Sequence, residues 1–503
     1  MDFLETLFSL PPLLYAPLLV GSLCLVFNYL VYSRRVAQWR KSNIPFLTPS
    51  FLIGHKYSPG KQGKSLNSAT VNRDKDLVAF FIATMPVVLL RKPALIKQIF
   101  AKNFDEAFKT GIAVSHNDEI EPHMLSQSSS KRVWKAHRNA LSPMFATSRF
   151  SGERFATIRH HIAHMSAHVE EARLQGKPIN TKEVAMNFVL GSVSNSFLDL
   201  DYNSYEKEGE LRNVFTQMHL QGTPTLESLK LITQKHIESM KSLLQKQMKL
   251  RNQTGDNKND LIDLLIRLKE QDQDEKLDSE SGVTVEMISL GLSLLLGGCA
   301  GTNTVDNMVS FAMHLLSLYP EYQERIRYEV EDVMKKHKTT EFTYEVVRDL
   351  HFLHQCLHET ARLYPNTSAL TRVCTEDFTP AGTDYNFKKG ERIIVDPYSI
   401  HRDPEYFENP DVFDPDRFSP KNRDSKSIDA FLGFGKGPRK CPGNNVGLLI
   451  ASTLIGSLVH KYEIRPHSHM KQMDAFDFHP RSFAIVHKED VFVDVVPREV
   501  LAH

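Results

Sequence analysis

The sequence predicts a mainly helical protein with a smaller β portion and a transmembrane helix at its N-terminus. Three observations carry this prediction: a charge-free N-terminal stretch, long segments with helical periodicity, and short runs of β-branched and aromatic residues. The chain has 503 residues, of which 41% are hydrophobic, so it is large enough to bury a sizeable core.

The N-terminal stretch has the features of a membrane anchor. No charged side chain occurs from Thr6 to Ser33, and Leu18 to Tyr32 is a nearly unbroken apolar run. About 20 helical residues cross the hydrocarbon core of a bilayer. Arg34 and Arg35 follow the run, which predicts a cytosolic location for the rest of the chain. A cleaved signal peptide would instead carry its positive charge before the run. We therefore expect an uncleaved single-pass anchor at residues 1–33, a basic, proline-containing linker at 34–54 and one large folded domain at 55–503.

The remaining elements follow in order along the chain. Val78 to Leu90 reads as two short strands broken at Pro86, and helical periodicity dominates from about Pro93 to Leu250. Further on, the expected helices are Thr284–Tyr319, which contains no proline and should be buried, Glu321–Lys336, Thr343–Tyr364 and one helix after Cys441. The segments after Pro365 otherwise read as loops and short strands.

Composition excludes some classes of protein. The net charge is +1, from 61 basic and 60 acidic residues, so no global field favours nucleic acid as a partner. The cysteines are few, odd in number and scattered, which argues against a disulfide framework and for a reducing compartment. They are Cys24, Cys299, Cys356, Cys374 and Cys441.

The segment from Phe434 to Gly443 reads F-G-K-G-P-R-K-C-P-G and is the most informative in the chain. Its glycines allow the backbone to pass close to a flat ligand. Arg439 can neutralise a carboxylate, and a lone thiolate at Cys441 can bind a haem iron. The alternative is a glycine-rich surface turn with an inert thiol.

This segment resembles the haem-binding signature of the cytochrome P-450 superfamily, F-x-x-G-x-R-x-C-x-G, and the anchored N-terminus resembles its microsomal members. The resemblance implies that residues 55–503 form a haem-thiolate catalytic domain. It also implies haem b (iron protoporphyrin IX) as cofactor, Cys441 as the ligand of the iron, and Phe434 and Arg439 as cofactor-binding residues.

Other motifs recur in the order found in that superfamily. Glu359 and Arg362, three apart in H-E-T-A-R-L-Y-P, resemble its E-x-x-R, which pairs with the arginine of P-D-R-F at Arg417 in a structural role. Trp134 and Arg138 fit W-x-x-x-R, whose i,i+4 spacing places both side chains on one helix face toward a haem propionate. Arg372 resembles a further propionate-binding arginine.

The expected buried helix carries A-G-T-N-T-V at residues 300–305, which resembles the oxygen-activating motif A-G-x-(D/E)-T-T. Gly301 would leave space for dioxygen, and the Thr304 hydroxyl would relay protons. Asn303 replaces the usual acid, and an amide cannot deliver a proton. Asp306, three residues further on, is an acid that could compensate through water.

The resemblance predicts an oxidoreductase, a haem-dependent monooxygenase that hydroxylates or epoxidises an apolar lipid, steroid or xenobiotic with O2 and NADPH. Its expected partners are an NADPH-cytochrome reductase, a cytochrome b-type donor and the endoplasmic reticulum membrane, with the catalytic domain in the cytosol. Two alternatives stay open. Asn303 leaves room for a hydroperoxide or endoperoxide isomerase or dehydratase that needs no reductase. The other alternative is a non-catalytic haem binder, against which the intact Thr304 argues. The apolar side chains expected near the substrate are Leu294, Leu295, Ala369 and Phe483, and the basic side chains expected to face an electron donor are Lys131, Arg132, Lys135, Lys436, Arg439 and Lys440.

Overall fold

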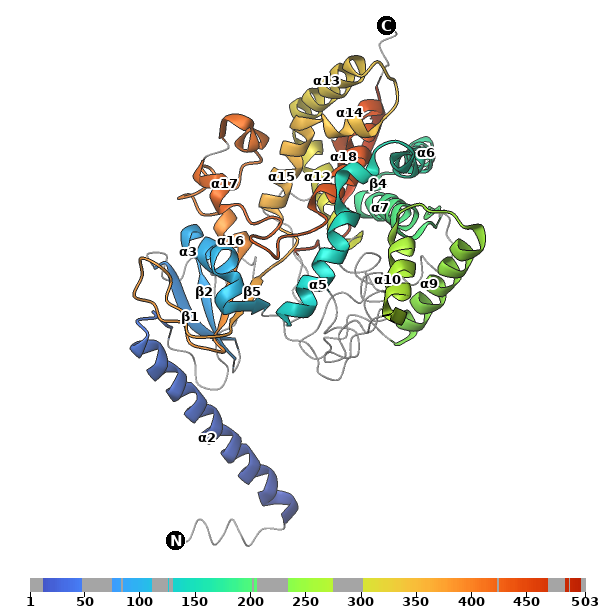
Figure 1. Cartoon of the computed structure of the whole chain (residues 1–503). Helices are drawn as coiled ribbons and strands as arrows, with labels where there is room; N and C mark the ends of the chain where they lie inside the picture. The colour runs from blue at the N-terminus through green and yellow to red at the C-terminus, as the bar shows by residue number, and fades with distance from the viewer. Residues whose placement is uncertain are drawn as a thin grey trace, which may run out of the picture. The chain divides into compact units, whose positions relative to one another are not determined.

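The computed structural model shows a mainly helical chain with two small sheets (Figure 1). It describes residues 12–47, 75–82, 85–110, 125, 130–200, 203–205, 234–274, 302–422, 425–468, 485–487 and 489–498. The chain forms two compact units: unit 1 lies within Met1–Gly111 and Ala369–Ser399, and unit 2 within Ile112–Ser368 and Ile400–His503.

Unit 1 is built on a five-stranded sheet with the strand order β1-β2-β6-β5-β3. Its strands are β1 (Leu77–Ile82), β2 (Met85–Leu90), β3 (Phe108–Thr110), β5 (Leu370–Cys374) and β6 (Arg392–Val395). Its helices are α2 (Pro12–Lys41), α3 (Pro93–Lys97), the π-helix η1 (Gln98–Lys102) and α4 (Phe104–Ala107). The β2–β6 pairing is parallel and the others are antiparallel. The two strands expected between Val78 and Leu90 are confirmed.

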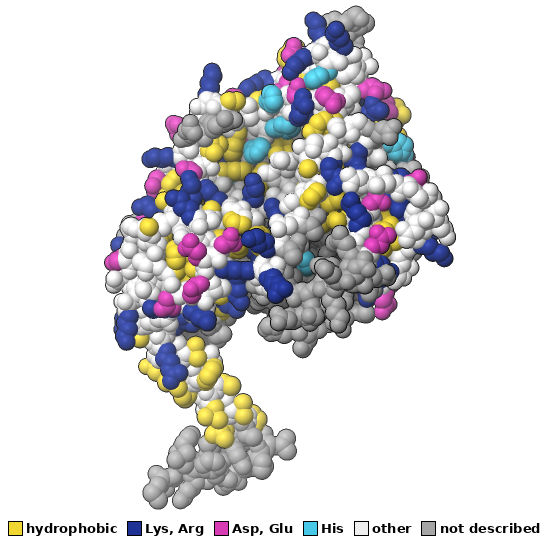
Figure 2. Space-filling model, viewed as in Figure 1, with side chains coloured by type: hydrophobic (Ala, Val, Ile, Leu, Met, Phe, Trp, Pro, Cys, Tyr) yellow, Lys and Arg dark blue, Asp and Glu magenta, His cyan; other side chains and the backbone are white. Residues whose placement is uncertain are grey.

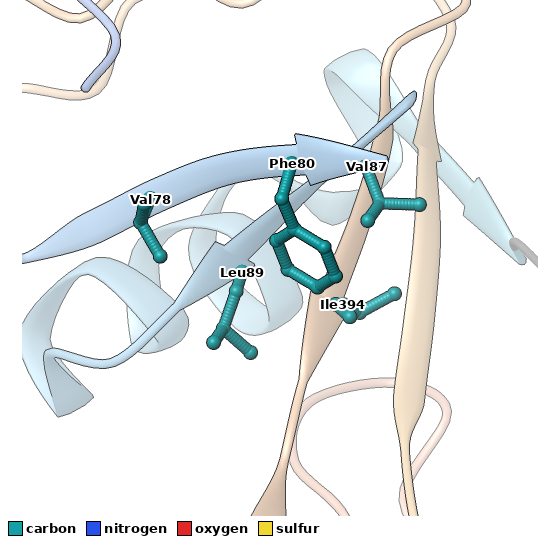
Figure 3. Close-up of a cluster of buried hydrophobic side chains, with 5 residues drawn as sticks. All are labelled: Val78, Phe80, Val87, Leu89 and Ile394. Carbon is teal, nitrogen blue, oxygen red and sulfur yellow. The ribbon is translucent and has the colours of Figure 1, made fainter. Parts of the chain in front are cut away.

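One face of this sheet carries a hydrophobic cluster. Val78 and Phe80 of β1, Val87 and Leu89 of β2, and Ile394 of β6 gather on that face (Figure 3). The residues alternate along β1 and β2 because successive side chains of a strand point to opposite faces. Each of the five is at most 5% exposed, so the cluster holds the sheet together by burying apolar surface.

The C-terminal part of helix α2 packs against the sheet. Trp39 is fully buried, its ring centroid lies 5.2 Å from that of Phe81, and its indole N–H donates to Glu391 Oε1 at 2.6 Å. Further toward the N-terminus its apolar side chains are exposed, as at Leu23 and Phe27 (Figure 2). Within the described part of the chain no helix is both long and apolar enough to cross a membrane, so the expected N-terminal span is not confirmed.

Unit 2 contains most of the helices. They are α5 (Lys131–Leu141), α6 (Glu153–Leu174), α7 (Thr181–Leu198), α9 (Gln234–Thr254), α10 (Leu261–Asp274), α12 (Thr302–Leu318), α13 (Pro320–Lys336), α14 (Tyr344–Arg348), α15 (His351–Leu363), α17 (Lys426–Ala430) and α18 (Asn444–Lys461). The short 3₁₀ helices are η3 (Ser142–Phe145), η4 (Thr147–Phe150), η6 (Pro415–Phe418) and η7 (Pro420–Asn422), and α16 (Pro397–His401) is the helix in which the chain passes from unit 1 to unit 2. An antiparallel sheet with the order β4-β8-β7 joins β4 (Ile179–Asn180), β7 (Tyr462–Pro466) and β8 (Phe492–Pro497).

Helix α12 lies in the core of unit 2. It packs against α7, α15 and α18, and Val309, Phe311 and Leu315 are fully buried. The helix ends before Pro320, which occupies the first turn of α13 because proline cannot continue a helix but suits the start of one. The prediction that this segment is a buried helix is confirmed for its described part.

The prediction of a single helix at Thr343–Tyr364 is wrong, because the structure has two helices there, α14 and α15. The break falls at Asp349, whose carboxylate contacts Lys336, His337 and Arg348. Helix α15 then begins against α13: the carboxylate of Glu329 accepts the backbone N–H groups of Phe352 at 2.7 Å and Leu353 at 3.1 Å. A cap supplied by another helix leaves no local signal in the sequence.

Candidate functional site

The loop between α17 and α18 folds back on itself around Cys441. The backbone N–H of Cys441 donates to the carbonyl oxygen of Phe434 at 2.9 Å, and that of Lys440 to Gly437 at 3.0 Å. Gly435 and Gly437 have φ angles of 75° and 78°. These left-handed conformations favour glycine, which explains why the loop needs it at both positions.

Opposing effects act on the Cys441 thiol, and burial outweighs the others, so its pKa lies above the ordinary value. Burial raises the pKa of its thiol, while hydrogen bonds from the backbone N–H groups of Gly443 and Asn444 and the charge of Arg138 act to lower it. Gly443 and Asn444 begin α18, so the sulfur lies at a helix N-terminus, where a negative charge is stabilised. Cys441 is nevertheless exposed to solvent, so protein surrounds the sulfur without closing it off. Among the described residues, no cluster of three or more His, Cys, Asp or Glu side chains forms a site in which protein ligands alone could hold a metal ion.

Helix α5 supplies two side chains near this loop. The guanidinium of Arg439 lies over the ring of Trp134, 4.4 Å from its centroid, and Trp134 is 6% exposed. One turn along α5, burial lowers the pKa of Arg138 while the negative charge of Cys441 raises it. The structure therefore brings Trp134, Arg138, Arg439 and Cys441 together, as their motifs predict.

The same cluster fits the acidic edge of a haem. Burial lowers the pKa of Arg439 to about 10. A propionate carboxylate beside this cation would offset the cost of its desolvation and would bond its planar donor fork. The donor set, one thiolate with two arginines and an indole N–H nearby, thus matches an iron porphyrin.

Phe434 anchors the loop to α15. Its ring meets the ring of His358 edge-on, with 5.7 Å between centroids, and packs edge-on against Phe431 at 6.1 Å. Helix α15 also carries Glu359 and Arg362, so the loop rests on the element that bears the E-x-x-R motif.

Glu359 and Arg362 form a buried bidentate ion pair. Arg362 Nε and Nη2 each lie 2.7 Å from a Glu359 carboxylate oxygen, and both residues are fully buried. Arg417 Nε lies 3.4 Å from Glu359 Oε1, which also accepts the backbone N–H of Asp414 at 3.0 Å. The guanidinium of Arg362 further donates to the carbonyl of Pro410 at 2.6 Å. The three expected residues therefore lie together, with Glu359 and Arg362 hydrogen-bonded to each other and Arg417 held beside them as an ion pair.

His401 connects this ion pair to the cysteine loop. Its Nδ1–H donates to the carbonyl of Arg362 at 2.9 Å, and its Nε2 accepts the backbone N–H of Leu432 at 2.8 Å. Carbonyl and amide partners fix the neutral tautomer. Burial and the charge of Arg362 lower the pKa of His401 to about 3. This histidine has a structural role, because it ties α15 to the residues just before the loop.

The first turn of α12 holds Asn303 and Thr304, both half-buried, and Asp306, fully buried. The neighbouring Val305 packs against α18: a Cβ placed on Gly447 would come within 3.2 Å of Val305 Cγ2. Gly301 lies outside the described residues, as do Leu294, Leu295 and Phe483.

The sequence did not reveal what holds this turn. Asn366 donates from Nδ2 to the carbonyl oxygen of Thr304 at 2.8 Å and accepts from Asn307 Nδ2 at 2.8 Å. The only signal in the sequence is an asparagine directly after Pro365, a position at which polar residues are common.

Arg372 belongs to unit 1, and the two aromatic rings against which its side chain lies belong to the same unit. It occupies β5, is 6% exposed, and places its guanidinium 4.1 Å from the ring centroid of Phe100 and 5.3 Å from that of Phe104.

Comparison with known proteins identifies the family of the chain. The family model described as Cytochrome P450 matches residues 43–490. The chain belongs to the cytochrome P450 family. It is similar to Cytochrome P450 6k1 of Blattella germanica, with 26% identity over 89% of this chain and 91% of the relative. It is also similar to Cytochrome P450 6a8 of Drosophila melanogaster, with 26% identity over 94% and 97% of the two chains, and to Cytochrome P450 6B7 of Helicoverpa armigera, with 23% over 97% and 99%.

Membership in the cytochrome P450 family fixes the general chemistry. The chain is an oxidoreductase, a haem-dependent monooxygenase, with the mainly helical fold of that family. Cytochromes P450 use a haem iron, bind small-molecule substrates and receive electrons from a redox partner.

Proposed function

We propose that the protein hydroxylates or epoxidises an apolar small molecule, a lipid, steroid or xenobiotic, with O2 and electrons from NADPH. The observation that supports this proposal best is the surroundings of Cys441, where a thiol at a helix N-terminus lies beside Arg138 and close to the stacked Arg439 and Trp134. Haem b would be held there, with Cys441 as the ligand of its iron.

In this proposal the surrounding side chains hold the cofactor. Arg439, Arg138 and the indole N–H of Trp134 would bind its propionates. Phe434 would pack at the proximal side and fix the loop. When bound, haem supplies the activation of dioxygen at an iron to which the thiolate donates electron density.

Side chains in the first turn of α12 would deliver protons to the bound oxygen. Thr304 would hold and pass a proton through its hydroxyl, Asn303 would orient water with its amide, and Gly301 would leave room above the iron. Because Asn303 cannot deliver a proton, the acid Asp306, one turn further on the same helix face, would supply it through water.

Electrons would come from an NADPH-cytochrome reductase, with a cytochrome b-type protein as a second donor. Support comes from exposed basic residues near the cysteine loop, Arg132 and Lys135 on α5 and Lys440 in the loop. Cations on one surface steer an acidic protein and make its association rate depend on salt.

We also propose attachment to the endoplasmic reticulum membrane through residues 1–33, with 34–54 as a linker and 55–503 as the cytosolic catalytic domain. Support comes from the exposed apolar side chains of α2, among them Leu23 at 60% and Phe27 at 67% exposure. Apolar side chains exposed to this extent favour burial in lipid.

The test is reconstitution with NADPH-cytochrome reductase and a panel of apolar lipids, steroids and xenobiotics. We expect an oxygenated product that requires NADPH, O2 and the reductase. Product formed only from hydroperoxides, without reductase, would identify an isomerase or dehydratase instead. Haem binding without turnover in either assay would indicate a non-catalytic haem binder.

A further inference from the structure

Two asparagines, Asn307 and Asn366, connect the first turn of α12 to other segments of unit 2. Asn307 Nδ2 donates to Asn366 Oδ1 and to the carbonyl oxygen of Ile485, each at 2.8 Å. Asn366 Nδ2 in turn donates to the carbonyl oxygen of Thr304 at 2.8 Å. The three bonds form one chain from Ile485 through both amides to Thr304.

The direction of every bond in this chain is fixed by chemistry. A backbone carbonyl can only accept, so the amides of Asn307 and Asn366 must turn their nitrogen atoms toward Ile485 and Thr304. The remaining Asn366 oxygen then accepts the second N–H of Asn307. Asn307 is 3% exposed, so an aspartate or alanine there would leave acceptors buried without these donors.

A ring stack fixes the same face of α12. Phe311 lies flat on Tyr364, with 3.9 Å between ring centroids and 5° between planes. Thr304, Asn307 and Phe311 are spaced i, i+3 and i+7, which places them along one side of the helix. The short segment from Tyr364 to Asn366 therefore holds two successive turns of α12.

We propose that Asn307 and Asn366 are positioning residues that set the orientation of the Thr304 turn, a role that rests on the proposed function of Thr304. Neither asparagine need touch haem or substrate. They act through the Thr304 carbonyl, which fixes the backbone from which the Thr304 hydroxyl projects. The hydrogen bonds of the two asparagines also couple the position of the Thr304 turn to that of the segment after α15.

The test uses the haem-loaded, full-length protein and the variants Asn366→Ala, Asn307→Ala and Asn307→Asp. The matched control is Thr343→Ala, because Thr343 caps α14 in the same unit by accepting the N–H group of Val346 at 3.3 Å. Loss of that cap lowers stability at a helix that packs against α13 and α18. Two signals are measured: amide hydrogen exchange of a peptide covering Thr302–Phe311, and the C–O stretching band of the reduced protein with carbon monoxide, which senses polar groups near the ligand.

We expect exchange in this peptide to become about tenfold faster in all three asparagine variants, as loss of roughly one buried hydrogen bond implies. The double variant Asn307→Ala/Asn366→Ala should be no faster than Asn366→Ala, because both residues belong to one chain of bonds. The C–O band should shift or broaden in the same variants. Thr343→Ala should change neither signal.

In the reductase-reconstituted enzyme, the asparagine variants should release severalfold more hydrogen peroxide per NADPH than the wild type, with little change in the apparent KM for NADPH. The proposal would be overturned if Asn366→Ala kept the hydrogen exchange and the C–O band of the wild type. Equal changes in Thr343→Ala would overturn it as well. Failure of the proposed function would be a separate result. The wild type would then form no product that depends on NADPH, whereas the comparison of hydrogen exchange between the variants would remain valid.

Discussion

The guanidinium of Arg439 stacks on the indole of Trp134, with the Cζ atom 4.4 Å from the ring centroid. This contact joins the cysteine loop to α5, two segments about 300 residues apart in the sequence. The contact places a cation and an indole N–H donor from two segments at one place. Both groups can donate hydrogen bonds to a carboxylate.

The first prediction concerns haem retention. Trp134→Leu and Arg439→Ala should each weaken haem binding by about tenfold, because each removes a charge-assisted or indole hydrogen bond to a propionate. Haem content per protein after gel filtration measures the effect. Arg132→Ala, an exposed residue on the same helix, should retain full haem content. Equal loss in that control would contradict the assigned roles.

The second prediction concerns the buried ion pair. Glu359→Ala should lower the free energy of unfolding by about 3–5 kcal/mol, because it leaves Arg362 buried without its carboxylate partner. Urea unfolding followed by circular dichroism measures the change. Glu463→Ala is a suitable control, since Glu463 pairs with the exposed Arg465 on β7 and its loss should cost no more than about 1 kcal/mol.

The third prediction concerns pH. The pKa of His401 is lowered to about 3 by burial and by Arg362, whereas an unfolded histidine titrates near ~6.5. Below pH ~6.5 the unfolded chain gains a proton that the folded chain does not, so stability is present above that pH and falls as pH decreases. The slope is at most about 1.4 kcal/mol per pH unit for this group.

His401→Asn isolates the effect of this histidine from that of the other buried histidines. The variant should be less stable at pH 7, because the bonds to Arg362 and Leu432 are weakened. Between pH 6.5 and 5 (~one and a half units below the ordinary histidine pKa), its stability should fall less steeply than that of the wild type. Parallel curves for the two proteins would show that His401 does not titrate as argued.

The fourth prediction concerns protons at bound oxygen. Thr304→Ala should raise hydrogen peroxide release at the expense of product, and Thr304→Ser should keep most of the coupling because it keeps the hydroxyl. Asn303→Asp, which places an acid at that position, should raise product per NADPH by about two- to tenfold, a modest part of what a positioned proton donor provides. Peroxide and product are measured together in the reconstituted enzyme. Unchanged coupling in Thr304→Ala would remove Thr304 from the proposed relay.

Much of the site could be predicted from the sequence because its signals are local. Glycines at Gly435 and Gly437 mark a loop that needs positive φ, and the i,i+4 spacing of Trp134 and Arg138 places both side chains on one helix face. Arg417 and Glu359 could be paired only through the resemblance, and the structure places them 3.4 Å apart.

Features that depend on distant partners could not be predicted. The break between α14 and α15 follows from Glu329 of α13, and the Asn307–Asn366 chain follows from how α12 meets the segment after α15. Gly447 lowers helix propensity, but a Cβ at this position would lie 3.2 Å from Val305 Cγ2, and this close packing explains the glycine. In each case one residue's role is set by a neighbour more than twenty positions away.

The most direct test of the account is the absorption spectrum of the purified protein reduced under carbon monoxide, recorded for the wild type and Cys441→Ser. The account predicts the red-shifted Soret band of a thiolate-ligated haem in the wild type and its loss in the variant. A folded wild type that shows only the band of a histidine-ligated haem, or the thiolate band persisting in Cys441→Ser, would contradict it.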